Sequence, residues 1–317
     1  MVLDLRSFLF LKLINIQTKL FVCKSNSETL PLSYEDWLRK LRQNTNRPCF
    51  PKFLSEFPIA KVVNTNLNGA CGKRPARIFI PKSPIIGSIF FIHGGGFVHC
   101  GLDSHHGICC RLAQASGCVV VSFDYRLAPE HPFPSAVEDC WAGLKQWADY
   151  AKPKWGKLVV AGDSAGGNLA AVMTHLAKEK AYPKIDLQLL YYPSTHGGRF
   201  VPSHKQYAYG YMLTEDVLRW YASQYLTKEE DYNDPRLAPI LYSSFDSLPP
   251  AIIITADCDP LRDEGYEYAQ KLKSAGVSVI YRCYRGTIHA FLNFYSFMPK
   301  AKDSIRFAGK IIKKYFQ

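Results

Sequence analysis

At 317 residues, with 47% apolar and 21% charged side chains, the chain has the length and composition of one large globular domain with a sizeable core. It contains no run of eighteen uncharged apolar residues, which excludes an ordinary membrane-spanning helix. The formal charge of +12 would suit an anionic partner, but no nucleic-acid-binding motif accompanies it, so we expect a solvated basic surface and no nucleic-acid partner.

The first stretch, residues 1–24, is apolar but lacks the pattern of a signal peptide. Asp4 precedes Arg6, Lys12 and Lys19 interrupt the apolar run, and no small-residue cleavage site follows. We expect an amphipathic helix packed on the protein, with an export or membrane-surface segment as the alternative. Its apolar face would consist of Leu5, Leu9, Leu13, Ile16 and Leu20. Ten cysteines without an export signal favour a reducing compartment, so we expect a cytoplasmic protein without stable membrane insertion.

A second helix is predicted to begin at Ser33. Residues 33–36, SYED, have a capping-box pattern that precedes the apolar Trp37. No obvious strand occurs between residues 1 and about 45.

From about residue 77 onward, short apolar runs alternate with segments of helical periodicity. The runs are ARIFI, GSIFFI, CVVVSF, KLVVA, LQLLYY, AIIIT and VSVIYRC. Most are apolar at consecutive positions, as strands buried on both faces must be. Between them lie the segments SHHGICCRLAQAS, SAVEDCWAGLKQWA, GGNLAAVMTHLAKE and EGYEYAQKLKSAG. This alternation predicts a mainly parallel sheet covered by helices on both faces.

The alternation is interrupted at about residues 197–233, which are aromatic and helical. We expect this insertion and the helices of residues 1–45 to pack together as a cap over the carboxyl ends of the strands, where open α/β sheets place their sites. Aromatic residues of the insertion either line an apolar pocket or pack the cap itself, and packing is the expectation for most of Tyr207, Tyr209, Tyr211, Trp220, Tyr221 and Tyr225.

The strongest chemical signal is the hexapeptide GDSAGG at 162–167. It follows the run KLVVA directly and opens a helical segment, so a strand, a sharp turn and a helix surround G-x-S-x-G. Such a turn exposes the Ser164 hydroxyl above the sheet and places the Ala165 amide at a helix N-terminus, where backbone donors are unpaired. We therefore expect Ser164 to be a nucleophile, with Asp163 beside it in the motif.

A glycine-rich segment, His93-Gly94-Gly95-Gly96-Phe97, follows the run GSIFFI. Consecutive glycines let the backbone approach a reacting carbonyl closely and direct amides towards it. A glycine run by itself is often only a flexible loop. Because this one precedes the GDSAGG turn, we expect its amides to form an oxyanion hole together with the Ala165 amide.

A nucleophilic serine needs a base, and the base needs an acid that fixes its tautomer. In folds that carry this turn, the chain order is serine, acid, histidine. Three histidines follow the helical segment that begins at GDSAGG. His196 and His204 fall in the insertion, whereas His289 follows the last apolar run by a short loop. We expect His289 to be the base. The acid follows AIIIT, where spacing alone does not decide between Asp257 and Asp259, while Asp263 and Glu264 are explained as helix N-terminal charges.

Together these segments resemble the hormone-sensitive-lipase-like family of esterases, in its GDSAG subgroup. The resemblance covers about residues 77 to 295 and includes HGGGF at 93–97, DYRLAPEHPFP at 124–134 and DPLRDEG at 259–265. It implies an α/β-hydrolase catalytic domain over 46–317 with a cap from residues 1–45 and about 197–233. It also implies Asp259 as the acid, Gly95, Gly96 and Ala165 as oxyanion donors, and His93, Gly94 and Asp163 as motif support.

The resemblance further implies a carboxylesterase that acts on short- to medium-chain acyl esters without a metal or cofactor, and that is often dimeric. The chain departs from the family at three positions. His106 is followed by Gly107 where the family usually has a His-Asp pair, Cys258 replaces a larger residue, and Cys100 replaces a small or aliphatic one.

Three alternatives remain open. A metal hydrolase would use His105 and His106 beside Cys109 and Cys110, but the further ligands expected nearby are missing. A small-molecule receptor of the same fold usually lacks the catalytic histidine, whereas His289 is present. An amidase or deacetylase would use the same triad.

Overall fold

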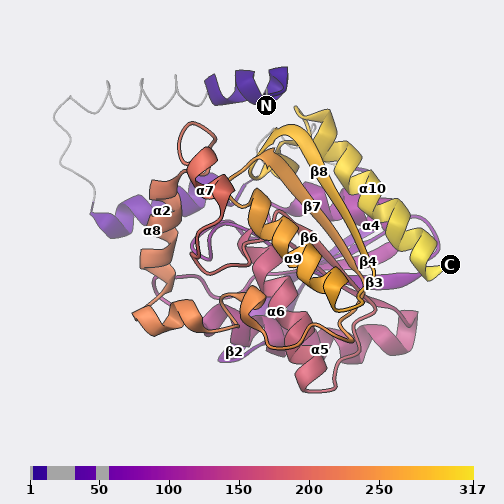
Figure 1. Ribbon diagram of the computed structural model, residues 1–317. Helices are drawn as coiled ribbons and strands as arrows, with labels where there is room; N and C mark the ends of the chain where they lie inside the picture. The colour runs from indigo at the N-terminus through magenta and orange to yellow at the C-terminus, as the bar shows by residue number, and fades with distance from the viewer. Residues whose placement is uncertain (1–2, 13–32, 48–56) are drawn as a thin grey trace.

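The computed structural model describes residues 3–12, 33–47 and 57–317 and contains a single large sheet flanked by helices (Figure 1). The strands are β1 (Lys61–Gly69), β2 (Gly72–Ile80), β3 (Gly87–Ile92), β4 (Cys118–Phe123), β5 (Leu158–Asp163), β6 (Leu187–Tyr191), β7 (Ala251–Cys258) and β8 (Val279–Ile288). Their spatial order is β1-β2-β4-β3-β5-β6-β7-β8. β2 pairs antiparallel with β1 and β4, and the remaining pairs are parallel. The predicted α/β-hydrolase fold is confirmed.

The central strands are buried on both faces, as their continuous apolar sequences predicted. Every residue of β3, β4, β5, β6 and β7 is buried. Each apolar run of the sequence lies on one of the eight strands. The strand that the sequence did not reveal is β1, KVVNTNLNG, which is an edge strand with mostly exposed or half-exposed side chains and therefore has no continuous apolar run.

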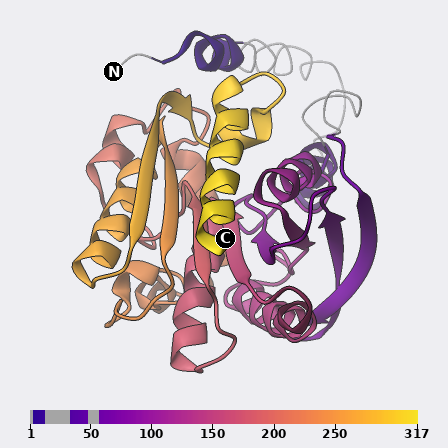
Figure 2. The same ribbon diagram turned by 90° about the vertical axis from the view of Figure 1, so that its right-hand side faces the viewer.

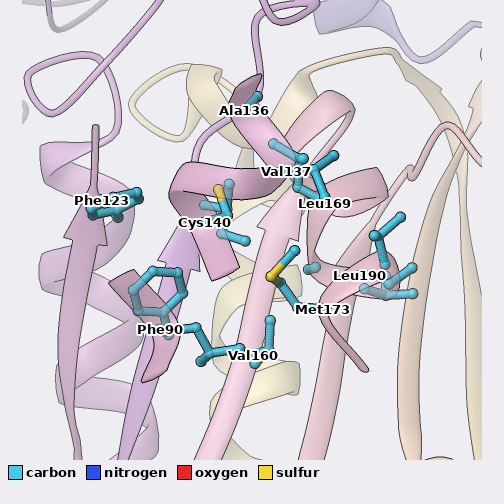
Figure 3. Close-up of a cluster of buried hydrophobic side chains, with 14 of the residues drawn as sticks. Phe90, Phe123, Ala136, Val137, Cys140, Val160, Leu169, Met173 and Leu190 are labelled. Carbon is cyan, nitrogen blue, oxygen red and sulfur yellow. The ribbon is translucent and has the colours of Figure 1, made fainter. Parts of the chain in front are cut away.

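Helices cover both faces of the sheet and create two apolar cores (Figure 2). On one face lie α5 (Ser135–Trp155), α6 (Ala165–Glu179) and α9 (Arg262–Ser274). On the other face, α4 (His106–Ser116) packs against α10 (Pro299–Phe316). Figure 3 shows part of the first core, in which Phe90 and Val160 of the sheet meet Leu169 and Met173 of α6.

The helix over residues 5–12 turns a different face to the protein from the one that its sequence predicted. Leu5 and Leu9 are 70% and 43% exposed, whereas Ser7 and Leu11 are buried. The prediction that Leu5 and Leu9 form the packed face is therefore wrong, and the other residues assigned to that face lie outside the described residues. The helix packs through its other side because Phe10 contacts Phe294, with ring centroids 4.1 Å apart, and the neighbouring Leu11 is buried in the second core.

The helix α2 (Tyr34–Thr45) begins where its sequence predicted, since the Ser33 hydroxyl accepts a hydrogen bond from the Asp36 amide at 3.1 Å. Trp37 of α2 meets Trp220 of α8 (Glu215–Tyr225) edge to face, with ring centroids 5.4 Å apart. Figure 1 shows α2 beside α8, so the two helical segments outside the alternating pattern are in contact. Within the ranges that the structure describes, no helix is long and apolar enough to cross a membrane.

Candidate active site

Ser164 lies on a sharp turn between the last residue of β5 and the first residue of α6. Its backbone φ is positive, 55°, with a ψ of −119°, a conformation that non-glycine residues rarely adopt. The turn has no room for side chains on either side: a Cβ added to Gly166 would lie 2.1 Å from the carbonyl oxygen of Ile92, and one added to Gly162 would lie 2.2 Å from that of Gly166. The glycines at these positions let strand and helix approach closely enough for the serine to project from the sheet edge.

A continuous hydrogen-bonded chain joins Ser164, His289 and Asp259. His289 Nε2 lies 2.9 Å from Ser164 Oγ, and His289 Nδ1 lies 2.7 Å from Asp259 Oδ2. Asp259 follows β7 and His289 follows β8, so both reach the site from the carboxyl ends of neighbouring strands. Asp259 is fully buried, and its Oδ1 accepts the Leu261 amide at 2.9 Å, which fixes the carboxylate in place.

The other carboxylates that the sequence offered have different partners. Asp257 Oδ2 accepts the Gly286 amide at 2.9 Å and ties β7 to the end of β8. Asp263 Oδ2 accepts the Ser203 amide at 2.9 Å. Asp259 is thus the candidate that contacts His289, a distinction that sequence spacing did not make.

His196 and His204 are engaged by acidic residues of α9 and do not reach Ser164. His196 Nε2 lies 2.9 Å from Glu267, and His204 Nε2 lies 2.7 Å from Glu264. Glu264 is in the first turn of α9, as its sequence position predicted, but it is also buried and accepts the backbone amides of Thr195 and His196. Its role in shaping the loop after β6 could not be derived from a helix-start pattern alone.

The HGGG loop lies beside the serine turn and is held by it. The Gly94 amide donates to Asp163 Oδ1 at 2.9 Å, and Gly95 and Gly96 have positive φ angles of 113° and 60°. Within the described parts of the chain, the backbone amides of Gly95, Gly96 and Ala165 have no protein acceptor. Gly96 and Ala165 share with Ser164 the lining of one cavity. These donors are therefore available to an atom bound in that cavity.

Asp163 is the buried support of this loop. His105 Nε2 lies 3.0 Å from its Oδ1, at the start of α4. Burial opposes ionisation of Asp163, but His105, the Gly94 amide and His93 outweigh it and hold the pKa of the carboxyl below its ordinary value. His93 is also buried, and its ring stacks on Tyr125 with centroids 4.4 Å apart. The sequence did not reveal the role of His105, because the family's His-Asp pattern is broken after His106.

The two adjacent histidines do not converge on a common point. His105 faces Asp163, whereas His106 packs edge-on against Phe79 and its Nδ1 lies 3.3 Å from Arg77. The residues described contain no group of three or more histidine, cysteine or acidic side chains that would hold a metal ion.

The cavity beside Ser164 has a volume of about 750 Å³ and mostly apolar walls. One wall comes from α7 (Pro202–Gln206), α8 and the segment between them, and the other comes from loops at the sheet edge. Apolar lining residues include Phe97, Leu213, Leu218, Ala222, Leu226 and Leu261. Of the aromatic residues of the insertion, Tyr209, Tyr221 and Tyr225 line the cavity, while Tyr207 is buried in the second core.

Comparison with known proteins gives consistent results. A family model described as the alpha/beta hydrolase fold matches residues 89–293. The chain is 40% identical over 247 residues to the carboxylic ester hydrolase LipN of Mycobacterium tuberculosis, covering 74% of this chain and 65% of LipN. It is 36% identical to the ethyl acetate hydrolase of Pseudomonas putida, covering 73% and 75% of the two chains. The solved structure of an esterase from Pyrobaculum calidifontis superposes with a TM-score of 0.82 at 37% identity, covering 87% of this chain and 93% of that one.

Proposed function

This chain is a carboxylic ester hydrolase that belongs to the hormone-sensitive-lipase-like family of α/β-hydrolases, and from that premise we propose that Ser164, His289 and Asp259 are its catalytic triad. The observation that carries the proposal is the pair of hydrogen bonds, 2.9 and 2.7 Å long, that runs from the serine through the imidazole to the buried carboxylate. We also propose, from the pentapeptide GDSAG at 162–166, that the chain belongs to the subgroup of that name.

In the proposed reaction, His289 Nε2 takes the Ser164 proton as Ser164 Oγ attacks the ester carbonyl carbon. The Asp259 carboxylate accepts a hydrogen bond from Nδ1–H of the imidazole and stabilises the imidazolium. The tetrahedral intermediate collapses when the alcohol leaves with a proton from Nε2. Water then loses a proton to the same nitrogen and attacks the acyl-enzyme. The carboxylic acid leaves as Nε2 returns that proton to Ser164 Oγ, which restores the starting enzyme. These steps require neither a metal ion nor an organic cofactor.

The amides of Gly95, Gly96 and Ala165 are the proposed donors to the oxyanion. Two observations support this assignment: their hydrogens lack protein acceptors in the described chain, and Gly96 and Ala165 line the cavity that contains Ser164. Each such donor stabilises the transition state by about 3–4 kcal/mol. Gly94 is assigned a different role, because its amide already donates to Asp163.

The triad assignment is tested by covalent titration with a p-nitrophenyl phosphonate ester, which phosphonylates an activated serine and releases p-nitrophenolate. We expect release of about one p-nitrophenolate per chain and a phosphonyl group on the peptide that contains Ser164, because the base and the oxyanion donors converge there. A second serine, such as the exposed Ser223 of α8, provides the internal control. Ester hydrolysis without labelling of Ser164 would contradict the assignment.

We further propose that the substrates are esters of short- to medium-chain acids and that the cavity against α8 holds the acyl chain. Its volume of about 750 Å³ and its apolar walls support this proposal. The name of the Pseudomonas putida relative, an ethyl acetate hydrolase, is consistent with a short acyl group. For the whole protein we propose a cytoplasmic location, on the ground of its ten cysteines. On the ground of the family resemblance alone, we propose a homodimer.

A change of cavity size tests the acyl-chain proposal. Ala222 lines the cavity, and Ala222→Phe adds a ring to it. We expect kcat/KM for p-nitrophenyl octanoate to fall about tenfold or more, since overpacking a pocket costs about 1–3 kcal/mol. The value for p-nitrophenyl acetate should stay within about twofold of wild type. Ser223→Phe, which adds the same group to the exposed neighbouring position, is the matched control. Equal losses on acetate and octanoate would contradict an acyl pocket against α8.

A further inference from the structure

The ring of Tyr221, from the cap helix α8, lies directly against the HGGG loop. A Cβ added to Gly96 would lie 2.2 Å from Tyr221 Cδ1 and 2.4 Å from Cε1 and Cγ. The space that a side chain at residue 96 would occupy is therefore filled by the face of this tyrosine. Gly96 is one of the proposed oxyanion donors, so Tyr221 packs on the part of the HGGG loop that would bind the oxyanion.

The hydroxyl of Tyr221 ties the ring to the same loop at a second point. It lies 2.6 Å from His99 Nε2, three residues beyond Gly96. The backbone amides of Val98 and His99 donate to the Gly95 carbonyl at 3.0 and 3.1 Å. The loop thus turns back on itself between residues 95 and 99, and Tyr221 spans that turn.

His99 is an uncharged hydrogen-bond partner for the Tyr221 hydroxyl. Burial, assisted by His93, His105 and Arg42, lowers the pKa of His99 to about 4. At neutral pH its uncharged ring therefore has one nitrogen that accepts a hydrogen bond and one that donates. The other nitrogen, Nδ1, lies 3.1 Å from Cys100 Sγ. A neutral imidazole pairs with the tyrosine hydroxyl without placing a positive charge beside the oxyanion site.

Tyr221 is also held from behind by the second cap segment. Its neighbour Trp220 packs edge-on against Trp37 of α2, with ring centroids 5.4 Å apart, and this contact anchors α8 on α2. The Tyr221 ring is consequently fixed between α8, which is anchored on α2, and the HGGG loop.

We propose that Tyr221 is a positioning residue of the oxyanion hole, which holds the Gly96 amide in the orientation for catalysis through its ring contact with Gly96 and its hydrogen bond to His99. The need for it follows from the sequence, because three successive glycines have more accessible backbone conformations than any other tripeptide. Preorganised donors stabilise the oxyanion only if they do not have to reorient during the reaction. This inference rests on the proposed function of the site.

The test compares Tyr221→Phe, Tyr221→Ala and the control Tyr34→Phe, which also removes a hydroxyl that contacts α8 but does not touch the loop. For p-nitrophenyl acetate we expect kcat to fall about tenfold in Tyr221→Phe and about 100-fold in Tyr221→Ala, with KM within about twofold of wild type. Tyr34→Phe should retain the wild-type kcat. A double cycle with His99→Phe should be non-additive, since both changes remove the same hydrogen bond.

Binding of a trifluoromethyl ketone separates positioning from a merely structural role, because its adduct with Ser164 places an oxyanion in the same hole. We expect its affinity for the Tyr221 variants to fall by the same factor as kcat/KM. A rise in KM at unchanged kcat, or an unchanged affinity for the ketone, would overturn the inference. If Tyr221→Ala does not fold, Tyr221→Phe still decides. A wild-type enzyme without esterase activity would instead contradict the proposed function itself.

Discussion

Replacing Ser164 by alanine is expected to lower kcat for p-nitrophenyl acetate by a factor on the order of 10⁵ to 10⁶, because the atom that forms the acyl-enzyme bond is removed. The fold should survive, since alanine has no greater steric difficulty than serine with the positive φ of 55° at this residue. Initial rates of p-nitrophenolate release, compared with thermal unfolding of both proteins, measure the two effects separately.

The control for this change is Ser223→Ala, which alters an exposed serine on α8 and should leave kcat unchanged. A Ser164→Ala protein that kept most of its activity would exclude the serine mechanism. Loss of activity accompanied by loss of folding would show only that the turn is structurally essential, and phosphonate titration of the wild type would then decide the identity of the nucleophile.

Replacing Asp259 by asparagine is expected to lower kcat by a factor on the order of 10⁴. An asparagine amide fits the same space, but it can donate a hydrogen bond to His289 Nδ1. This favours the tautomer in which the imidazole proton is on Nε2, and a protonated Nε2 cannot accept the proton of Ser164. Asp257→Asn is the matched control, because its carboxylate instead accepts the Gly286 amide at 2.9 Å. We expect Asp257→Asn to keep kcat within about tenfold and to lose about 1 kcal/mol of stability.

Steady-state kinetics and urea unfolding of both aspartate variants provide the comparison. A large loss of kcat in Asp257→Asn together with near-normal activity in Asp259→Asn would reassign the acid. The pair therefore settles by experiment the alternative that the sequence left open between two aspartates only two positions apart.

The parts of the fold that could be predicted from the sequence are those in which one residue pattern has one physical solution. Consecutive apolar side chains, as in CVVVSF and AIIIT, are removed from water only when both faces of a strand are covered. Both runs lie in strands whose residues are all buried. The order of the glycine loop, the serine turn and His289 similarly predicted that these segments lie together, because the carboxyl ends of parallel strands share one edge of the sheet.

The features that could not be predicted depend on contacts between distant segments. β1 has few buried side chains because it is an edge strand, so its sequence carries little periodic signal. The helix over residues 5–12 has leucines on more than one side, and the choice of its buried face is made by Phe294, almost the whole chain away. Likewise, nothing near His105 in the sequence indicates that it will face Asp163.

The contacts of the N-terminal helix have a consequence for biosynthesis. Arg6 donates to the Phe297 carbonyl across a sequence separation of 291 residues, and Lys300 pairs with Asp4 across 296. The partners Phe297 and Lys300 follow His289 closely in the sequence, and His289 itself follows β8 at the edge of the sheet. On the ribosome, Ser164 is synthesised well before His289, its proposed base, and the helix over residues 5–12 can dock only after residues 294–300 have been made. The proposed triad is thus completed late in synthesis, so shorter nascent chains contain Ser164 without the histidine that would activate it.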